Sequence, residues 1–398
     1  MPLPSFSRIN SLTVRPMVQR LNADPLAVYL HWPYCAAICP YCDFNVHLDK
    51  RADEGEQLVA AMVADLAYWR DWSGAREVSS IHFGGGTPSL LTGAQLTTLT
   101  EAVRSLWTTE GAEIALEANP NDVTEARIAA WRAAGLTRLS LGVQSFDDAV
   151  LTRLGRDHDG ASARHALSHA VDNFASVSAD LIFGVAGERE ARLSEDLDIL
   201  LDLGVAHIST YQLTIETGTA FARAEARGTR RAVSEDQSAE DFEMISARLR
   251  AAGYRHYEVS NFAKPGAESR HNLAYWRGYD YVGVGPGAHG RLWTDAGRIA
   301  TETALRPTDY IRAVKTDGTA LTDRDRLSAE AAAEEYVMMG LRIEDGLSLS
   351  RLADIQGQAL AIDPALVEEG LLSINGDRLR ATPRGRMVLD ALTRALLL

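Results

Sequence analysis

Three closely spaced cysteines constrain this chain more than any other feature of its sequence. Cys35, Cys39 and Cys42 follow the spacing CxxxCxxC, and they are the only cysteines among the 398 residues. This spacing lets three thiolates face one object, which suits the corner of a cubane iron–sulfur cluster. A [4Fe–4S] cluster normally takes four cysteines. Because the chain has no fourth cysteine, one iron would stay open to an external ligand.

Two other uses of these cysteines fit the sequence less well. A structural zinc site of the Cys3His type could recruit His31 or His47, but zinc knuckles usually pair two close CxxC-like hooks. A disulfide with one spare thiol is disfavoured, because the number of cysteines is odd and nothing else indicates secretion. The sequence therefore favours a cluster held by three thiolates.

The composition of the chain limits its possible binding partners and cellular compartment. The formal net charge of −14 argues against a nucleic-acid partner and against an anionic membrane surface. No apolar run approaches the ~18 residues of a spanning helix, so we expect no integral membrane segment and leave peripheral contact open. Thiols gathered at one place and absent elsewhere fit a reducing compartment, so we expect a cytoplasmic protein.

Residues 1–25 are expected to form an N-terminal arm. The arm contains Arg8, Arg15 and Arg20 and no acid before Asp24, a pattern that faintly resembles a targeting segment. The whole chain uses Arg for nearly every cation, however, so the Arg content of the arm is close to background. A loosely docked arm is the favoured interpretation.

Residues 26–230 alternate between strand-like and helix-like segments. Six such alternations predict an α/β fold with a parallel sheet and outer helices, closed only partly as a (βα)6 barrel. Parallel sheets carry their chemistry on the loops at the carboxyl ends of the strands, and the cysteine run follows the first strand. The expected strands are 26–32, 78–83, 113–118, 138–143, 178–183 and 206–211, and the expected helices are 54–70, 123–134, 161–173 and 193–203.

Polar and glycine residues follow the next strands of this unit. The run GGGTPS at 84–89 comes after the second strand, and its glycines let backbone amides approach a ligand closely. Glu117, Gln144 and Asp180 are expected at or just past the carboxyl ends of successive strands. One such residue would ordinarily be a solvated loop side chain. Three at equivalent ends indicate a site.

Beyond residue 230 the alternation stops. Residues 231–325 are predicted to wrap the barrel, beginning with a helix at 233–252, and they are rich in aromatics, His and Arg. This mixture suits a flat aromatic ligand that carries carboxylates, although such His and Tyr residues can simply satisfy one another. Residues 326–398 are predicted to form a winged-helix-like domain, with helices 328–342, 349–357, 364–372 and 384–397 and a wing at 374–383.

Several motifs together resemble a known family. CxxxCxxC with Tyr41 before its last cysteine resembles the radical S-adenosylmethionine (SAM) signature, and GGGTPS resembles the motif that holds the SAM amine. With LEANP, SLGVQS and ADLIFG, the chain from about Ala27 onward resembles the oxygen-independent coproporphyrinogen III oxidase superfamily. The decarboxylases of that superfamily carry another cysteine where this chain has Phe44. YEVSNFA at 257–263 and HNLAYW at 271–276 instead resemble its HemW branch, whose HNxxYW motif is associated with haem.

The resemblance implies the cofactors and partners. It implies a [4Fe–4S] cluster, SAM and haem, with a reductant for the cluster and acceptor apo-haemoproteins as partners, and no decarboxylase activity. It implies His271 as the haem ligand, with His289 or His256 as alternatives. Cys35, Cys39 and Cys42 would hold the cluster. The implied SAM contacts are Tyr29, Tyr41, Gly85, Gly86, Thr87, Glu117, Gln144, Arg156 and Asp180, and of these Arg156 competes with the nearby Arg153.

Three hypotheses follow from the sequence. The first is a haem chaperone with a SAM-liganded cluster, in which SAM or cluster reduction controls haem release. The second is a radical-SAM decarboxylase of coproporphyrinogen III, which Phe44 disfavours. The third is a winged-helix regulator fused to a sensor cluster, which salt-sensitive DNA binding would support. The haem acceptor, the oligomeric state and a second SAM site are not determined by the sequence.

Overall fold

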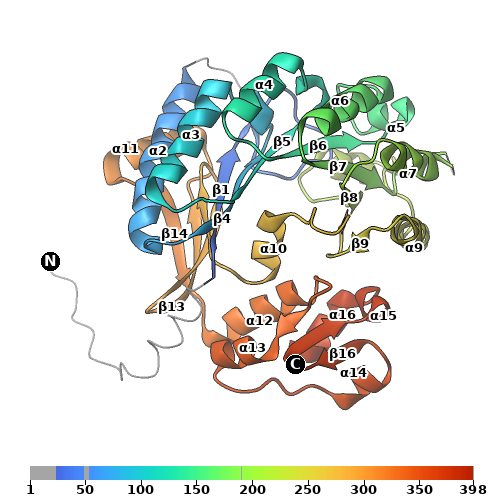
Figure 1. Cartoon of the computed structure of the whole chain (residues 1–398). Coiled ribbons are helices and arrows are strands. Elements are labelled where there is room, and N and C mark those ends of the chain that lie inside the picture. Colours follow the sequence, from blue (N-terminus) through green and yellow to red (C-terminus); the bar gives the residue numbers. More distant parts are fainter. Residues whose placement is uncertain (1–23, 49–52, 190, 398) are drawn as a thin grey trace.

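One twisted, open sheet organises most of the molecule. The computed structural model describes residues 24–48, 53–189 and 191–397, so the predicted arm lies outside the described residues except for Asp24 and Pro25. Twelve strands line up in the order β14-β13-β12-β11-β1-β4-β5-β6-β7-β8-β10-β9. β14 and β9 are the two edges, so the described strands form no closed barrel (Figure 1). The predicted α/β class with an unclosed parallel barrel is confirmed.

The parallel part of the sheet contains all six predicted strands. They pair in chain order, and β11 (Tyr281–Val284) adds a seventh parallel strand beside the first. Their carboxyl ends therefore share one rim of the sheet. The six strands are β1 (Leu26–Trp32), β4 (Val78–Gly85), β5 (Glu113–Ala118), β6 (Arg138–Gln144), β7 (Ser176–Phe183) and β8 (His207–Gln212).

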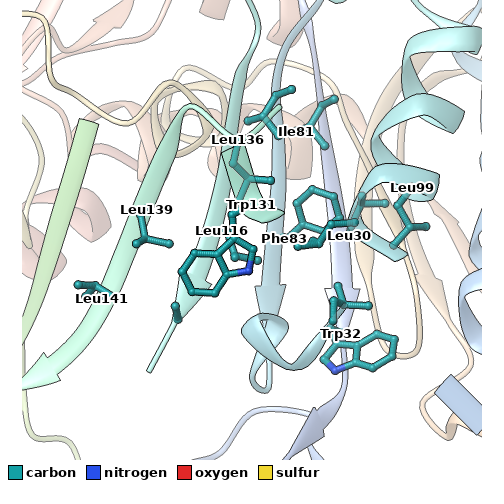
Figure 2. Close-up of a cluster of buried hydrophobic side chains, with 14 of the residues drawn as sticks. Leu30, Trp32, Ile81, Phe83, Leu99, Leu116, Trp131, Leu136, Leu139 and Leu141 are labelled. Atoms are coloured by element: carbon teal, nitrogen blue, oxygen red, sulfur yellow. The ribbon is translucent and has the colours of Figure 1, made fainter. Parts of the chain in front are cut away.

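Helices cover one face of this sheet, and their apolar side chains form the main core. Alternate residues of each strand point toward the helices, as the two-residue period of a strand requires. Figure 2 shows Leu30, Phe83 and Leu116 from the strands packed near Leu99 and Trp131 from the helices. Full burial of one such side chain contributes about 1.5–3 kcal/mol. The helices are α2 (Glu54–Ser73), α3 (Gly93–Leu106), α4 (Glu125–Ala133), α5 (Asp148–Arg153), α6 (Gly160–Asn173) and α7 (Arg192–Asp202), with short 3-10 turns at Pro88–Leu90 and Pro120–Asp122.

The other face of the sheet carries polar residues. On β1, for example, Val28 and Leu30 belong to the apolar core, whereas Tyr29 and His31 occupy the alternate positions and join a polar network. This uncovered face is where the loops at the strand ends, helix α10 (Arg270–Trp276) and the C-terminal helices gather (Figure 1). Because side chains alternate along each strand, one face of the sheet forms the apolar core, and the other face carries polar side chains that can bind ligands.

The sequence analysis did not predict how residues 231–325 extend the sheet. The segment adds antiparallel strands at both edges, because each new strand pairs with an otherwise open edge. At the β14 edge the exposed sequence is Thr-Asp-Arg-Asp-Arg, and charges of this kind discourage pairing with other chains. The short helix α8 (Ala220–Glu225) precedes this segment. The elements that follow it are α9 (Glu235–Ala251), β9 (Arg255–His256), β10 (Asn261–Ala263), β12 (His289–Thr294), β13 (Gly297–Thr303), α11 (Pro307–Asp317) and β14 (Leu321–Arg326).

The described part of the C-terminal segment forms five helices and a wing around a second apolar core, where four helices and a wing were predicted. Its last helix is interrupted at Met387 and Val388, where one continuous helix was expected. No described helix is long and apolar enough to cross a membrane. The predicted domain boundaries stay predictions. The elements are α12 (Ala329–Gly340), β15 (Leu347–Ser348), α13 (Leu349–Gln356), α14 (Pro364–Glu368), β16 (Leu372–Asn375), β17 (Arg378–Ala381), α15 (Pro383–Arg386) and α16 (Leu389–Leu397).

Candidate cofactor-binding site

The three cysteines lie on one loop at the carboxyl end of β1. Two short parallel strands, β2 (Tyr34–Cys35) and β3 (His47–Leu48), join the ends of this loop. The backbone N–H of Cys42 donates to the carbonyl of Cys39 at 3.1 Å, which turns the loop back on itself. Burial raises the pKa of the Cys35 and Cys42 thiols. Metal binding to these sulfurs must therefore release protons.

The glycine run after β4 fits directly against the cysteine loop. A Cβ on Gly86 would lie 2.7 Å from the carbonyl oxygen of Tyr34 and 2.9 Å from Sγ of Cys35. Gly85 has φ +115°, which other residues rarely adopt. Hydrogen bonds from the Gly86 and Thr87 N–H groups to the carbonyls of Trp32 and Tyr34 (2.7 and 2.8 Å) hold the two loops together. Only glycine permits this approach.

A cavity of about 400 Å³ opens between these loops and the strand ends. Its apolar wall includes Ile38, Phe44 and Leu213, so it offers both polar and apolar surface. Two predicted site residues, Tyr29 and His271, do not line it. The eleven predicted residues that do are Cys35, Cys39, Tyr41, Cys42, Gly85, Gly86, Thr87, Glu117, Gln144, Arg156 and Asp180.

Glu117 is held in place by a neighbour that the sequence analysis missed. Its Oε1 accepts from Nε2 of His82 at 3.0 Å, and its Oε2 accepts from the Gly85 N–H at 3.3 Å. His82 alternates with the core residues of β4 and so points to the polar face, a signal that was readable from the strand pattern. These two hydrogen bonds hold the carboxylate of Glu117 in a fixed position at the cavity wall.

His271 lies behind Glu117 rather than in the cavity. Its ring stacks on that of His82, with centroids 4.5 Å apart and planes 12° apart. Its Nδ1 is 2.9 Å from the hydroxyl of Ser80 and its Nε2 is 2.7 Å from the hydroxyl of Tyr275. Burial lowers the pKa of His271 well below its usual value, so the ring is neutral. Coordination of an iron would require His271 to give up one of these hydrogen bonds.

Tyr29 also lies beneath the cavity wall. Its ring stacks on both His82 and His271 at 6.0 Å, and its hydroxyl is 3.0 Å from Nδ1 of His31. The other ring nitrogen of His31 is 3.0 Å from the carbonyl oxygen of Asn45, near the end of the cysteine loop. Burial raises the pKa of Tyr29 well above its usual value. Tyr29 therefore connects the His82–His271 stack with the cysteine loop.

Asp180 and Gln144 reach the cavity from different backbone positions. Asp180 was expected at or just past the carboxyl end of its strand, but it lies within β7, which ends at Phe183 as predicted. Its carboxylate accepts from the hydroxyl of Ser140 at 3.1 Å, and burial raises its pKa to about 6. Gln144 does end β6, with φ 65°, and its buried Oε1 has no hydrogen-bond partner among the described residues. This oxygen is therefore able to accept a hydrogen bond from a ligand in the cavity.

Arg156, rather than Arg153, faces the cysteine loop. Its Nη1 is 3.3 Å from Sγ of Cys39, and its Nη2 donates to Oδ1 of Asn119 at 2.6 Å. Arg153 instead donates to the backbone carbonyls of Ala186 and Gly187. Burial alone lowers the pKa of Arg156, but the charges of Tyr41 and Cys39 outweigh it and raise the pKa.

The two alternative haem-ligand histidines differ in their exposure. His256 is buried, stacks on Phe262 at 4.2 Å, and lies 2.9 Å from the carbonyl oxygen of Val259. Burial lowers its pKa to about 4. His289, at the start of β12, is exposed to solvent. Of the three histidines considered, only His289 is open to a ligand in this conformation.

Comparison with known proteins agrees with this geometry. Residues 29–200 match the radical SAM superfamily and residues 327–388 match the HemN C-terminal domain. Coproporphyrinogen III oxidase (HemN) from Escherichia coli has a similar fold, with a TM-score of 0.79 over 98% of this chain and 93% of that chain, at 23% identity. The chain is thus a radical SAM protein with a HemN-type C-terminal domain.

Sequence relatives identify its family. The heme chaperone HemW of Mycobacterium tuberculosis is 38% identical over 386 residues, which is 96% of this chain and 97% of the relative. HemW of Escherichia coli (strain K12) is 36% identical over 95% of this chain and 99% of the relative. A mouse protein, radical S-adenosyl methionine domain-containing protein 1, mitochondrial, is 36% identical over 96% of this chain and 91% of the relative. The chain belongs to the HemW family.

Proposed function

We propose that this chain is a haem chaperone that carries a [4Fe–4S] cluster with bound SAM and delivers haem to acceptor apo-haemoproteins. The observation that carries the proposal is the cavity that gathers all three cysteines with eight further residues implied for SAM. Likeness to HemW proteins over nearly the full chain supports the haem part of the proposal.

The residues of the cavity fit the proposed cofactors. Cys35, Cys39 and Cys42 supply three thiolates, which leaves one iron of a cubane open. The backbone of Gly85 and Gly86 packs directly against the cysteine loop. The side-chain Oε1 of Gln144 is a hydrogen-bond acceptor that has no partner among the described residues. When bound, the cluster supplies an electron to the sulfonium of SAM. The protein's own part is to orient SAM, with Glu117 and Asp180 as carboxylate acceptors for its hydroxyls.

A radical-SAM decarboxylase of coproporphyrinogen III is the alternative. Phe44 disfavours it, because this side chain stands where the decarboxylase branch has a cysteine, and 64% of Phe44 is exposed at the mouth of the cavity. The solved coproporphyrinogen III oxidase supports the fold alone at its level of identity. The haem chaperone is therefore preferred.

One anaerobic experiment separates these functions. The cluster is reconstituted in the purified full chain, haem is added, and absorption spectra are recorded beside an assay for decarboxylated tetrapyrrole. We expect haem binding, transfer to an apo-haemoprotein and no decarboxylation. Haem retention is then compared with and without reductant and SAM, because we propose that one of them controls release. Decarboxylated product, or no haem bound, would overturn the proposed function.

A further inference from the structure

A second hollow lies between the sheet and the C-terminal domain. This interdomain cleft has a volume of about 710 Å³ and is lined from α10, the segment leading to β11, α13 and the wing strand β17. Its volume falls within the range of small-molecule sites, about 300–1,000 Å³. None of the three cysteines and none of the implied SAM contacts lines it, so it is a separate site.

Two arginines on the wing line this cleft, and the charge of Arg378 is felt by Asp377, whose pKa it helps to lower. Arg378 and Arg380 alternate on β17 with Leu379 and Ala381, which are buried in the C-terminal core, so both arginines occupy the outward face. Arg378 donates to the carbonyl of Gly346 at 3.4 Å and Arg380 to that of Asp345 at 3.2 Å. Neither makes an ion pair with any described residue, so most of their N–H groups are free for a ligand.

Two further arginines at the base of the cleft are each paired with an aspartate. Arg277 pairs with Asp345 at 3.1 Å, and Arg351 pairs with Asp24. Four arginines and three aspartates line the cleft in total, in a chain whose formal net charge is −14. Guanidinium groups bind carboxylates through paired hydrogen bonds. The lining of the cleft therefore carries one more cationic than anionic side chain, and the wing arginines supply this excess.

An aromatic pocket adjoins the arginine cleft. This pocket of about 140 Å³ shares Trp276 and Tyr336 with the cleft, and it is also lined by Tyr275, Tyr281 and Trp293. Tyr275 and Trp276 end the HNLAYW motif on α10. The guanidinium groups of Arg342 and Arg351 lie over the rings of Trp276 and Tyr336 at 4.9 and 5.6 Å. A planar aromatic dicarboxylate held in the cleft would contact the uncovered parts of these two rings.

The cofactor cavity does not offer such a place. Arg156 is the only arginine that lines it among the described residues, and its guanidinium already contacts Cys39 and Asn119. Four acids also line that cavity, and they would repel a dianion. These acids are Asp43, Glu117, Asp180 and Glu216.

We propose that the interdomain cleft holds the carboxylates of a tetrapyrrole on Arg378 and Arg380, with the ring against Trp276 and Tyr336. The inference rests on the proposed function and adds the position and the anchoring groups of the cargo. It also gives the HNxxYW motif a part in haem binding through Trp276 instead of through a bond from His271 to iron.

The test compares two matched double variants of the full chain. R378A/R380A removes the wing arginines, and R384A/R394A removes two exposed arginines of the same domain that do not line the cleft. Titration with haem, followed by absorption and tryptophan fluorescence, gives affinities for each variant. The titration is repeated with protoporphyrin IX and with its dimethyl ester, in which the carboxylates are blocked. SAM binding and circular dichroism report on the fold.

The expected result is an affinity loss of about tenfold or more for haem in R378A/R380A, since each charge-assisted hydrogen bond is a strong one. R384A/R394A should stay within twofold of the unmodified chain, which should also prefer the free acid to the ester by about tenfold. Equal haem affinities of R378A/R380A and R384A/R394A, or equal affinities of the unmodified chain for acid and ester, would overturn the proposed tetrapyrrole site in the cleft. Either result would leave the proposed chaperone function standing. A chain that binds no tetrapyrrole at all overturns both.

Discussion

The cofactor cavity and the interdomain cleft differ in the charged side chains that line them. The cavity gathers thiols and carboxylates at the carboxyl ends of parallel strands, whereas the cleft gathers guanidinium groups from the C-terminal domain and α10. Helix α10 contacts both sides, with His271 stacked behind Glu117 and Trp276 in the cleft. Under the two proposals, the molecule would hold two ligands of opposite charge at separate sites.

Charge explains why the two ligands should stay apart. SAM carries a sulfonium and an ammonium group, and carboxylates proposed to accept from its hydroxyls, Glu117 and Asp180, would also attract these cations when ionised. A tetrapyrrole with two propionates is a dianion, which the same carboxylates repel and arginines attract. Removing one set of groups should therefore leave the other ligand in place.

The largest effect should come from the cysteine loop. Cys39→Ala removes one of three sulfurs, and we expect it to abolish the cluster absorption and every SAM-dependent spectral change, since two thiolates do not hold a cubane. Haem affinity should remain within twofold of that of the unmodified chain. The measurement is iron content and electron paramagnetic resonance after anaerobic reconstitution, beside a haem titration. R378A/R380A is the reciprocal control and should keep the cluster. A tenfold loss of haem affinity in Cys39→Ala would mean that the two regions form one site.

A smaller effect is expected at the stack between the two regions. His271→Ala removes the ring beneath His82, and Glu117 should then orient SAM less well, with an affinity loss of about three- to tenfold for a lost aromatic pair. His271→Phe keeps the ring and should retain most of the SAM affinity, at some cost in stability because Ser80 and Tyr275 lose a partner. Anaerobic dialysis with labelled SAM gives the affinities, and His165→Ala on α6 is an exposed control.

The same variants test the competing role of His271. If His271 is the haem ligand, Ala and Phe must both abolish the haem spectrum and leave SAM binding unchanged. If it is a positioning residue, haem affinity changes little and only the Ala variant weakens SAM. The two patterns are opposite, so one pair of titrations decides between them.

The sequence predicted the cofactor cavity well because that cavity depends on local order. The residues at or just after the carboxyl end of each parallel strand lie at the same edge of the sheet. Cys35, Gly85 and Gln144 are therefore expected to come together once the strands are known. The end of β7 at Phe183 was predicted correctly, and the error was to place Asp180 at or just past that end although it lies within the strand. Its side chain still reaches the cavity from within the strand.

The cleft was beyond sequence analysis for a physical reason. Arg378 and Arg380 meet Trp276 only because the C-terminal domain docks against α10, and such contacts are set by packing between distant segments rather than by a local period. The sequence did predict arginines and aromatics suited to a carboxylate-bearing ligand in residues 231–325. It could not show that two of the arginines would come from the wing.

The smallest expected effect is a pH dependence confined to the cofactor cavity. Burial raises the pKa of Asp180 to about 6, and the charge of Glu117 adds to the rise. Its hydrogen bonds with Ser209 and Ser140 and the charge of Arg138 act in the opposite direction. His207, 2.7 Å from the hydroxyl of Ser178, stays neutral because burial lowers its pKa well below its usual value. Asp180 is therefore the group of this set expected to change charge near neutral pH.

As the pH rises from about 5 to about 7, Asp180 passes from mostly protonated to mostly ionised, and the cationic cofactor should bind about three- to tenfold more tightly. Stability has the opposite sign, because a raised carboxyl pKa favours the folded state at low pH, and this contribution is lost as the pH rises through about 6. Asp180→Asn should remove the pH dependence of both SAM affinity and folding stability. Asp202→Asn, at an exposed residue of α7, should leave both pH dependences unchanged. Anaerobic SAM titrations and thermal unfolding at each pH measure the two effects. If SAM affinity still depends on pH in Asp180→Asn, another group titrates, and Asp180 has no part in binding SAM.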